Sequence, residues 1–256
     1  MKAPAELFDL GGKVAVVTGG SRGIGRTVAE GLATAGADVV IASRKADSCI
    51  TAAEEIADAT GRRAVGVGCH VGVWDDCDRL VETVYGEFGR CDVLVNNAGM
   101  SPTYDDLPSV TEALYDKVHA VNARGPFRLS ALFGSRMALG DGGSIINITT
   151  AGTLRPDEHD LPYCMAKAGL NVLTLGLAGA WPPKVRANLV LPGAFDTDIA
   201  AAWRAEMKQF SIDINPMKRI GQPEDLVGVC VFLASSASAY VNGAQILVDG
   251  GAFRSL

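Results

Sequence analysis

Short apolar runs alternate with longer helical stretches along most of the chain. Residues 14–17 read Val-Ala-Val-Val, and continuous apolarity of this kind is typical of a parallel strand buried on both faces. Six further runs favour strands, at residues 38–43, 65–69, 91–95, 143–148, 185–190 and 244–248. Helical stretches lie between them, one ending near residue 35 and others at residues 46–59, 73–88, 111–137 and 166–181. This rhythm predicts an α/β fold with a doubly wound parallel sheet of about seven strands.

The length of 256 residues suits one large α/β domain with a sizeable core. No internal repeat, low-complexity tract or linker divides the chain, so we expect residues 1–256 to form a single domain. The helices of a doubly wound sheet are expected on both of its faces.

Charge and composition exclude several function classes. The net charge is −6 with acidic and basic residues interspersed, so no basic stripe indicates nucleic acid or a membrane surface. No stretch approaches the about 18 uninterrupted apolar residues of a membrane helix, and residues 1–12 lack the apolar centre of a signal peptide. The cysteines form no CxxC pair and the three histidines are scattered, which argues against a metal site or a disulfide framework. We therefore expect a cytoplasmic protein with reduced thiols at Cys49, Cys69, Cys77, Cys91, Cys164 and Cys230.

A glycine-rich turn follows the first predicted strand and opens the first helix. Free backbone N–H groups and the helix dipole converge at such a turn and favour a phosphate group. The first glycine allows the tight turn, the second lets the backbone approach a pyrophosphate, and the third permits close packing of the helix. The expected dinucleotide contacts are Gly19, Ser21, Arg22, Gly23, Ile24 and Gly25.

The same turn also fits a different motif. Gly19-Gly20-Ser21-Arg22-Gly23 matches the G-x-S-x-G nucleophile elbow of hydrolases, which is likewise a turn from strand to helix. That elbow normally follows several strands, whereas this turn follows the first. Esterase or phosphatase turnover without a cofactor would support the hydrolase alternative.

The end of the second strand indicates which dinucleotide is bound. An acidic residue there accepts hydrogen bonds from the adenosine ribose, whereas arginine accommodates a 2′-phosphate. This chain has Ser43-Arg44-Lys45 at that position, with Arg22 nearby on the phosphate turn. A guanidinium binds a phosphate that a carboxylate would repel, so the sequence predicts NADP(H) in preference to NAD(H). The alternative is that Arg44 and Lys45 only solvate the start of the next helix.

Tyr163 and Lys167 form a candidate acid-base pair on the last long helix. Residues four apart lie on one face of a helix, so the phenol and the ammonium should approach the same point. A nearby cation favours the phenolate and should lower the pKa of Tyr163, which would let the pair move a proton to or from an alcohol or carbonyl. Taken alone, the same spacing also occurs on ordinary helix surfaces.

Several motifs in one order resemble the short-chain dehydrogenase/reductase family. They are residues 18–25, Asn96-Asn97-Ala98-Gly99, Asn122, Tyr163-x-x-x-Lys167, and residues 192–197 that begin with Pro192-Gly193 and end at Thr197. The resemblance runs from about residue 10 to residue 253. It implies a Rossmann-type fold and hydride transfer between NAD(P)H and a carbonyl or alcohol, usually without a metal.

The resemblance also implies roles for individual residues. Tyr163 would be the general acid-base, Lys167 would bind the nicotinamide ribose and lower the pKa of that tyrosine, and Asn122 would hold a water of the proton relay. Asn96 and Gly99, with Ala98 between them, would support the sheet and border the adenine site. Pro192, Gly193 and Thr197 would lie at the nicotinamide end.

Three positions depart from the family pattern. The catalytic serine is replaced by threonine, and either Thr149 or Thr150 could take its place, since two ways of counting favour different residues. Threonine keeps the hydroxyl donor but adds a methyl group. The acidic residue near the adenine amino group is replaced by His70, which could accept the same hydrogen bond through one ring nitrogen or could be an ordinary loop histidine. Trp181-Pro182-Pro183 ends the Tyr163 helix abruptly.

The sequence indicates the substrate and the oligomeric state less precisely than the fold and the cofactor. The expected pocket segments, residues 151–162 and 195–216, carry Arg155, Asp157, Glu158, His159 and Trp203, which name no single ligand. We expect a small carbonyl or alcohol, with a 3-oxoacyl-type or general ketone reductase as the interpretation, and a non-catalytic NADP-binding sensor or scaffold as the alternative. The helix after Tyr163 is apolar on nearly every side, so a partner helix across a two-fold axis is expected, in a homotetramer or homodimer.

Overall fold

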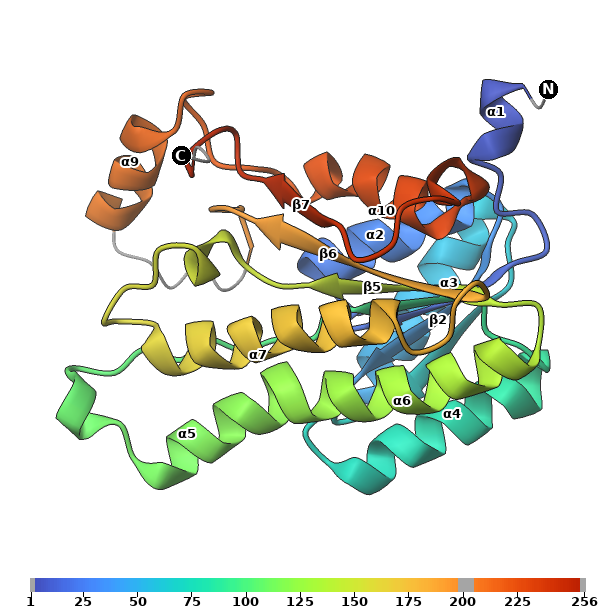
Figure 1. The fold of residues 1–256 in the computed structure, drawn as a ribbon, viewed down its shortest axis with the longest axis horizontal. Helices are drawn as coiled ribbons and strands as arrows, with labels where there is room; N and C mark the ends of the chain where they lie inside the picture. The colour runs from blue at the N-terminus through green and yellow to red at the C-terminus, as the bar shows by residue number, and fades with distance from the viewer. Residues whose placement is uncertain (1–2, 198–204, 254–256) are drawn as a thin grey trace.

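Seven parallel strands form one sheet in the order β3-β2-β1-β4-β5-β6-β7 (Figure 1). The computed structural model describes residues 3–197 and 205–253. The strands are β1 (Val14–Thr18), β2 (Asp38–Ser43), β3 (Ala64–Gly68), β4 (Val93–Asn96), β5 (Gly143–Ile148), β6 (Val185–Pro192) and β7 (Gln245–Val248). The strand order reverses between β1 and β4, and open α/β sheets bind ligands beyond the carboxyl ends of the strands at such a point.

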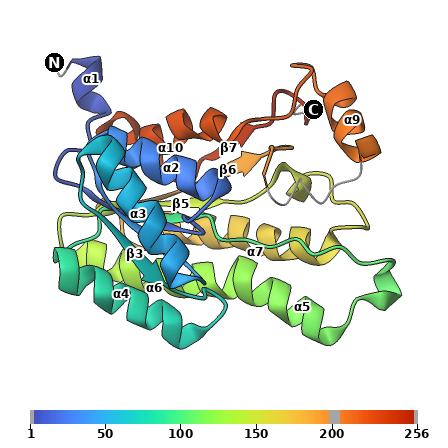
Figure 2. The same cartoon turned by 180° about the vertical axis from the view of Figure 1, so that it is seen from behind.

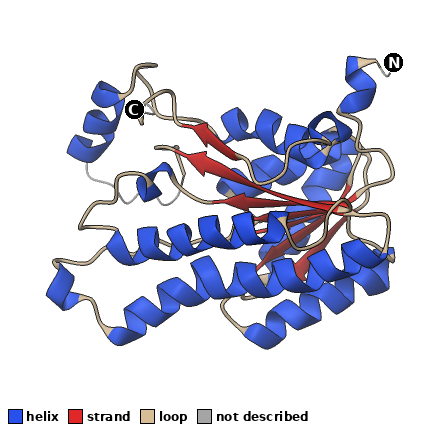
Figure 3. Ribbon diagram, in the orientation of Figure 1, coloured by secondary structure: helices blue, strands red, loops and turns tan. Residues whose placement is uncertain are grey.

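Helices cover both faces of the sheet (Figures 1 and 2). One layer contains α2 (Gly23–Thr34), α3 (Ala46–Thr60) and α10 (Val227–Ala234); the other contains α4 (Trp74–Phe88), α5 (Glu112–His119), α6 (Gly125–Leu139) and α7 (Leu161–Ala178). Two further helices, α1 (Pro4–Leu7) and α9 (Ala205–Ile214), lie at the periphery in Figure 3. The doubly wound, Rossmann-type α/β fold predicted from the sequence is confirmed.

The side chains of each central strand alternate between two apolar clusters. Val17 and Ile41 pack under α2 and α3, whereas Val16 and Val40 pack under α4 and α6. Successive side chains of a strand point to opposite faces of the sheet, and in a parallel sheet both faces are covered. The uninterrupted apolar runs in the sequence arise from this double burial.

The predicted helix over residues 111–137 is divided in the structure. A π-helical turn at Ala120–Arg124 separates α5 from α6, and the amide of Gly125 donates to the carbonyl of Ala120. Single π-turns within α-helices occur frequently at functional sites. Here the turn carries Asn122, which the sequence pattern identifies as a candidate site residue.

Helix α7 begins and ends earlier than residues 166–181. Its first turn contains Leu161 and Pro162, so Tyr163 lies in that turn, and the helix ends at Ala178 with Gly179 as its C-cap. Trp181 follows the helix, and a Cβ on Gly134 would lie 2.3 Å from its ring. Trp181 therefore packs closely against α6.

Five smaller observations complete the fold. The fourth strand begins at Val93 rather than residue 91, and β6 extends to Pro192. Among the helices of the described residues, none has the length and apolarity needed to span a membrane. All six cysteines are buried and free. Within residues 3–197 and 205–253, no cluster of histidine, cysteine and carboxylate side chains could hold a metal ion.

Candidate active site

The glycine turn after β1 has the geometry of an anion cradle. A Cβ on Gly25 would lie only 2.3 Å from the carbonyl oxygen of Gly19, so the helix can approach the turn only without a side chain. Gly23 has a φ of +53°, and a Cβ there would meet no heavy atom within 4 Å. Arg22 is the exposed N-cap of α2, and Ile24 packs against the core beside it. The turn therefore offers open backbone at the start of α2, as the sequence motif predicts.

Ser21 and Ser43 connect this turn to the end of β2. The hydroxyl of Ser43 donates to the hydroxyl of Ser21 at 2.9 Å, and Arg44 follows as an exposed side chain. The bond places Arg44 beside the phosphate turn, where a 2′-phosphate could reach both. The hydroxyl contact of Ser21 is with Ser43 and not with a histidine, so the geometry does not favour the hydrolase elbow.

Asn96 is the last residue of β4, and Ala98 and Gly99 follow the strand. Asn96 is buried, and its amide donates to Ser130 at 2.9 Å and to Asn147 at 2.8 Å. Asn96 therefore joins β4 to β5 and α6, which is the support of the sheet that the family resemblance implies for it. The Ala98 amide donates to the Thr18 hydroxyl at 3.1 Å, which fixes the backbone before Gly99 at the strand ends.

Sequence reasoning missed the partners of this motif. Thr18 accepts hydrogen bonds from Asn97 and Ala98, and Asn147 continues the buried chain by donating to Thr174 at 2.7 Å. The available signal was the presence of polar side chains inside apolar runs. A buried polar side chain in a strand requires a partner, so these positions could have been marked as a network.

Asn122 reaches the site from the π-turn. Its side-chain amide donates to the carbonyl oxygens of Met100 and Val118, each at 2.9 Å, and its side-chain oxygen accepts from the Met100 amide at 3.2 Å. A Cβ on Gly99 would lie 3.0 Å from Asn122 Oδ1 and 3.5 Å from Lys167 Nζ. The structure thus brings Asn122 and Lys167 together, and places Gly99 beside them.

Lys167 is buried beneath this point. Its Nζ donates to the carbonyl oxygen of Ile148 at 2.8 Å, and its side chain is only 2% exposed. Burial disfavours the charged ammonium and lowers the pKa of Lys167 to about 8.

Tyr163 lies above Lys167 in the first turn of α7. The Nζ of Lys167 is 5.8 Å from the centroid of the phenol ring. Burial raises the pKa of Tyr163 above its usual value; the neighbouring Cys164 and Asp160 act in the same direction, and the hydrogen bond with Thr150 opposes them. The expectation that Lys167 lowers this pKa is therefore corrected. The ammonium makes its bond to Ile148, and loss of water around the phenol is the larger effect.

The structure separates the two threonines. Thr149 is buried, and its hydroxyl donates to the carbonyl oxygen of Val190 at 3.4 Å. Thr150 is half-buried; its hydroxyl accepts from the Gly152 amide at 3.1 Å and lies close enough to Tyr163 to lower the pKa of that phenol. Of the two, Thr150 is the hydroxyl beside the phenol.

His70 lies after β3 and differs from the expected acceptor. Its Nδ1 accepts from the Gly72 amide at 3.1 Å, and its own amide donates to Asp76 at 2.9 Å. A neutral imidazole that accepts through Nδ1 carries its proton on Nε2. The remaining nitrogen is then a donor, so His70 cannot accept a hydrogen bond from an adenine amino group in this arrangement.

The end of β6 supplies the last predicted group. Pro192 is its final residue, the Gly193 amide donates to the carbonyl of Val248 at 3.0 Å, and Thr197 is half-buried. These residues lie at the carboxyl edge of the sheet, as expected for a ligand-facing segment. Trp203 and the rest of residues 198–204 lie outside the described residues.

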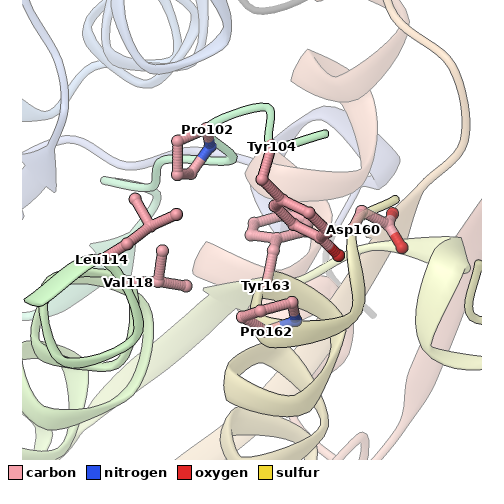
Figure 4. Close-up of a pocket in the computed structure, with 7 residues that line it drawn as sticks. All are labelled: Pro102, Tyr104, Leu114, Val118, Asp160, Pro162 and Tyr163. Carbon is pink, nitrogen blue, oxygen red and sulfur yellow. The ribbon is translucent and has the colours of Figure 1, made fainter. Parts of the chain in front are cut away.

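A hollow adjoins Tyr163 on the side of α5. Figure 4 shows its lining, in which mostly apolar side chains surround one carboxyl group: Pro102, Tyr104, Leu114, Val118, Asp160, Pro162 and Tyr163. Tyr104 closes one side, because its hydroxyl donates to the carbonyl of Glu158 and accepts from the Leu161 amide. The loop after β4 is thus fastened to the start of α7.

The residues present fit a nicotinamide dinucleotide. The cradle at Gly23 suits a pyrophosphate, and Ser43 with Arg44 suits the adenosine end. Lys167 and Tyr163 stand at the other end of the same edge, beside Thr150. The arrangement places hydroxyl donors where a substrate oxygen could bind.

Comparisons with known proteins agree with this geometry. A family model described as enoyl-(acyl carrier protein) reductase matches residues 19–252. The 2-dehydro-3-deoxy-D-gluconate 5-dehydrogenase of Pseudoalteromonas atlantica is 37% identical over 251 residues, which cover 96% of this chain and 98% of the relative. The 3-oxoacyl-[acyl-carrier-protein] reductase FabG of Aquifex aeolicus is 36% identical over 248 residues, which cover 96% of this chain and 99% of the relative.

A solved structure extends the likeness to three dimensions. The gluconate 5-dehydrogenase of Burkholderia cenocepacia, crystallised in complex with NADP and tartrate, superposes with a TM-score of 0.94 at 31% identity. The match covers 99% of this chain and 100% of that chain. The chain therefore belongs to the short-chain dehydrogenase/reductase family of oxidoreductases.

Proposed function

We propose that the protein transfers a hydride between NADP(H) and a carbonyl or secondary alcohol. The observation that carries this proposal is the placement of the Thr150 hydroxyl beside the Tyr163 phenol, with Lys167 one helical turn further along α7, at the carboxyl end of β5. Two hydroxyl groups that converge on one point can both donate to a substrate oxygen. When bound, the nicotinamide supplies the hydride, and the side chains supply the proton and hold the substrate.

In the reductive direction, Tyr163 donates its proton to the substrate oxygen while Thr150 stabilises the charge that develops there. The raised pKa of Tyr163 keeps the phenol protonated at neutral pH, which suits a general acid. Lys167 and Asn122 lie behind the phenol, where they can return the proton to it. Donors that are already in place lower the barrier because they need not reorganise during the reaction.

Preference for NADP(H) over NAD(H) rests on Arg44. Its guanidinium follows β2 beside the Ser21–Ser43 hydrogen bond, and no carboxylate stands at the end of that strand. An arginine binds a 2′-phosphate through charge-assisted hydrogen bonds. The complex of the Burkholderia relative with NADP supports the same preference. His70 would contribute a donor at the adenine end.

The substrate is proposed at the level of a ketone or the matching alcohol. A 3-oxoacyl-type reductase is supported by the relative from Aquifex aeolicus, and the two gluconate-type relatives support hydroxylated substrates. The hollow beside Tyr163 is mostly apolar but contains one carboxyl group, which both classes must accommodate.

The alternative is a non-catalytic NADP-binding sensor or scaffold. The fold alone permits it, because function depends on the site and not on the architecture. A sensor has no need for a phenol and a hydroxyl that meet above a buried lysine, so the Thr150–Tyr163 pair favours the enzyme.

A homotetramer or homodimer is proposed from the outer face of α7. Met165, Val172 and Leu175 are 48%, 71% and 49% exposed on this helix, and Cβ atoms on Gly169 and Gly176 would meet nothing within 4 Å. An apolar helix face with two glycines suits close packing against the same helix of a second copy. A monomer in light scattering would contradict this assembly. The buried free thiols favour a cytoplasmic location.

A cofactor and substrate screen tests the proposed function. Ketones with NADPH, and alcohols with NADP⁺, would be followed by nicotinamide absorbance, with NADH and NAD⁺ in parallel. The proposal predicts turnover that depends on the cofactor and is faster with the phosphorylated form. Binding of NADPH without turnover of any carbonyl or alcohol would favour the sensor, and hydrolysis without cofactor would favour the Ser21 elbow.

A further inference from the structure

One carboxyl group borders the hollow beside the phenol. Asp160 precedes α7 as its N-cap residue and belongs to the lining of the hollow, and Figure 4 shows its carboxyl oxygens directed away from Leu114 and Val118. The proposed proton transfer does not use it. Any substrate that binds beside Tyr163 must nevertheless be compatible with this carboxyl group.

Gly152 lies close to both the Asp160 carboxyl group and the Thr150 hydroxyl. A Cβ on Gly152 would lie 3.4 Å from Thr150 Oγ1, 3.6 Å from Asp160 Oδ2 and 3.1 Å from Cys164 Sγ. The hydroxyl that faces the substrate oxygen and the outer oxygen of Asp160 therefore border one small space. A substrate whose oxygen is held at Thr150 would therefore bring a neighbouring carbon close to Asp160 Oδ2.

The carboxyl is held in place from behind. The thiol of Cys164 donates to Asp160 Oδ1 at 3.2 Å, and the Asp157 amide donates to the same oxygen at 3.4 Å. Both bonds use Oδ1, and Oδ2 is the oxygen near Gly152. The Tyr104 clamp on Glu158 and Leu161 fixes the backbone on both sides. Burial raises the pKa of Asp160. The group is therefore preorganised rather than free to turn into solvent.

We infer that Asp160 determines substrate specificity by accepting a hydrogen bond from a hydroxyl group on the carbon next to the reacting carbonyl. The inference rests on the proposed function and deepens it: the preferred substrates are hydroxyketones, or the vicinal diols that correspond to them. A hydroxyl can bind either the ionised or the protonated carboxyl, because it both donates and accepts. A plain ketone offers Oδ2 no donor, so it lacks the binding free energy of that hydrogen bond.

The surrounding charge disfavours anionic substrates. Asp157 and Glu158 lie exposed beside Asp160, and the opposing charges on this segment are Arg155 and, when protonated, His159. Burial raises the pKa of the Tyr104 phenol most, and the charges of Asp160 and Asp157 raise it further. Because Tyr104 lines the hollow, the negative charge of these two residues acts there. Phosphate-bearing acyl carriers would approach against this field, whereas neutral hydroxyketones would not.

Matched pairs of ketones test the inference with NADPH. Acetoin is compared with 2-butanone, and 2-hydroxycyclohexanone with cyclohexanone, by the ratio of kcat/KM within each pair. The wild-type enzyme is expected to favour the hydroxyketone by roughly 10- to 100-fold, the range for a hydrogen bond to a buried charged group. Asp160→Leu, of similar shape, should reduce this ratio to near one, mainly through the hydroxyketone.

Two variants separate recognition from structural damage. Asp160→Asn keeps an acceptor oxygen and should retain part of the preference, while Asp157→Asn removes a neighbouring carboxylate outside the lining of the hollow and should leave the ratio unchanged. NADPH affinity, measured by fluorescence, checks that each variant is folded. A structural defect lowers both members of a pair and does not move their ratio.

The failing outcomes are distinct. Equal rates for both members of each pair in the wild type, or an undiminished preference in Asp160→Leu, would overturn the role of Asp160 while leaving the reductase intact. If the wild type prefers the matching aminoketone to the hydroxyketone, Asp160 recognises a positive charge and not a hydroxyl group. That result would also overturn the inference. If no ketone is reduced, the proposed function itself fails.

Discussion

The Nζ of Lys167 lies 2.8 Å from the backbone carbonyl oxygen of Ile148, the last residue of β5. This bond ties α7 to the strand end that leads directly into Thr149 and Thr150. Tyr163 is one helical turn before Lys167, so the same bond fixes the distance between the phenol and the Thr150 hydroxyl. The buried ammonium thus has a structural task as well as the proposed catalytic one.

Replacement of Lys167 by methionine should change how stability depends on pH. The pKa of Lys167 is about 8 in the folded protein and about 10.4 in an unfolded chain. Between these values the unfolded state binds more protons, so this lysine makes the wild type more stable as pH rises. Methionine does not titrate, and the wild type should gain about 2 kcal/mol relative to Lys167→Met between pH 7 and pH 9.5. Urea unfolding at both pH values measures this gain, and a constant difference would contradict it.

The two threonines should respond differently to the same substitution. Thr150→Val keeps the shape but removes the hydroxyl beside Tyr163, and loss of one such donor lowers kcat by about 10²- to 10³-fold. Thr149→Val removes only a long hydrogen bond to Val190 and should change kcat by a few-fold at most. Steady-state kinetics on one ketone decide between them. The reverse pattern would assign the substrate hydroxyl to Thr149.

Arg44→Ala should weaken the binding of NADPH and leave the binding of NADH unchanged. Loss of a charge-assisted hydrogen bond to the 2′-phosphate is expected to raise the KM for NADPH by about 10- to 100-fold, because such bonds contribute about 1.5–3 kcal/mol. The KM for NADH, which lacks that phosphate, should hardly change. Lys45→Ala is the matched control from the adjacent position. An equal effect on both cofactors would show that Arg44 does not read the phosphate.

Gly25→Ala should damage the phosphate cradle. The new Cβ would lie 2.3 Å from the Gly19 carbonyl oxygen, so the turn must move, and NADPH affinity should fall at least about tenfold. Gly86 in α4 is the control, since a Cβ there meets nothing within 4 Å. Gly86→Ala should leave NADPH affinity unchanged and raise the free energy of unfolding by about 0.4–1 kcal/mol. Equal NADPH affinity in both variants would contradict the cradle.

The sheet and the glycine turn could be predicted because their signals are local. A strand buried on both faces must be apolar throughout, as in Val14-Ala15-Val16-Val17, and a phosphate turn must lack side chains where the backbone approaches. The four-residue spacing of Tyr163 and Lys167 likewise follows from helix geometry. These features are written in consecutive residues.

The remaining features depend on contacts between distant segments. Thr149 and Thr150 are chemically equal in the sequence, and only the strand direction at Val190 and the start of α7 separates them. The direction of the pKa shift at Tyr163 depends on how much water its ring loses, which no spacing reveals. The Nδ1 bond of His70 to Gly72 requires the turn after β3. The break in the helix at Asn122 is different, because Pro126 in the first turn of α6 has no amide to donate to the Asn122 carbonyl and so marks the break in the sequence.

The central claim is that Tyr163 transfers the proton, and Tyr163→Phe tests it most directly. The variant keeps the ring in its contacts and removes only the hydroxyl. The kcat for a substrate that the wild type reduces should fall by about 10²- to 10⁴-fold, while the Kd for NADPH, measured in parallel, stays within a few-fold. A kcat near that of the wild type would contradict the account.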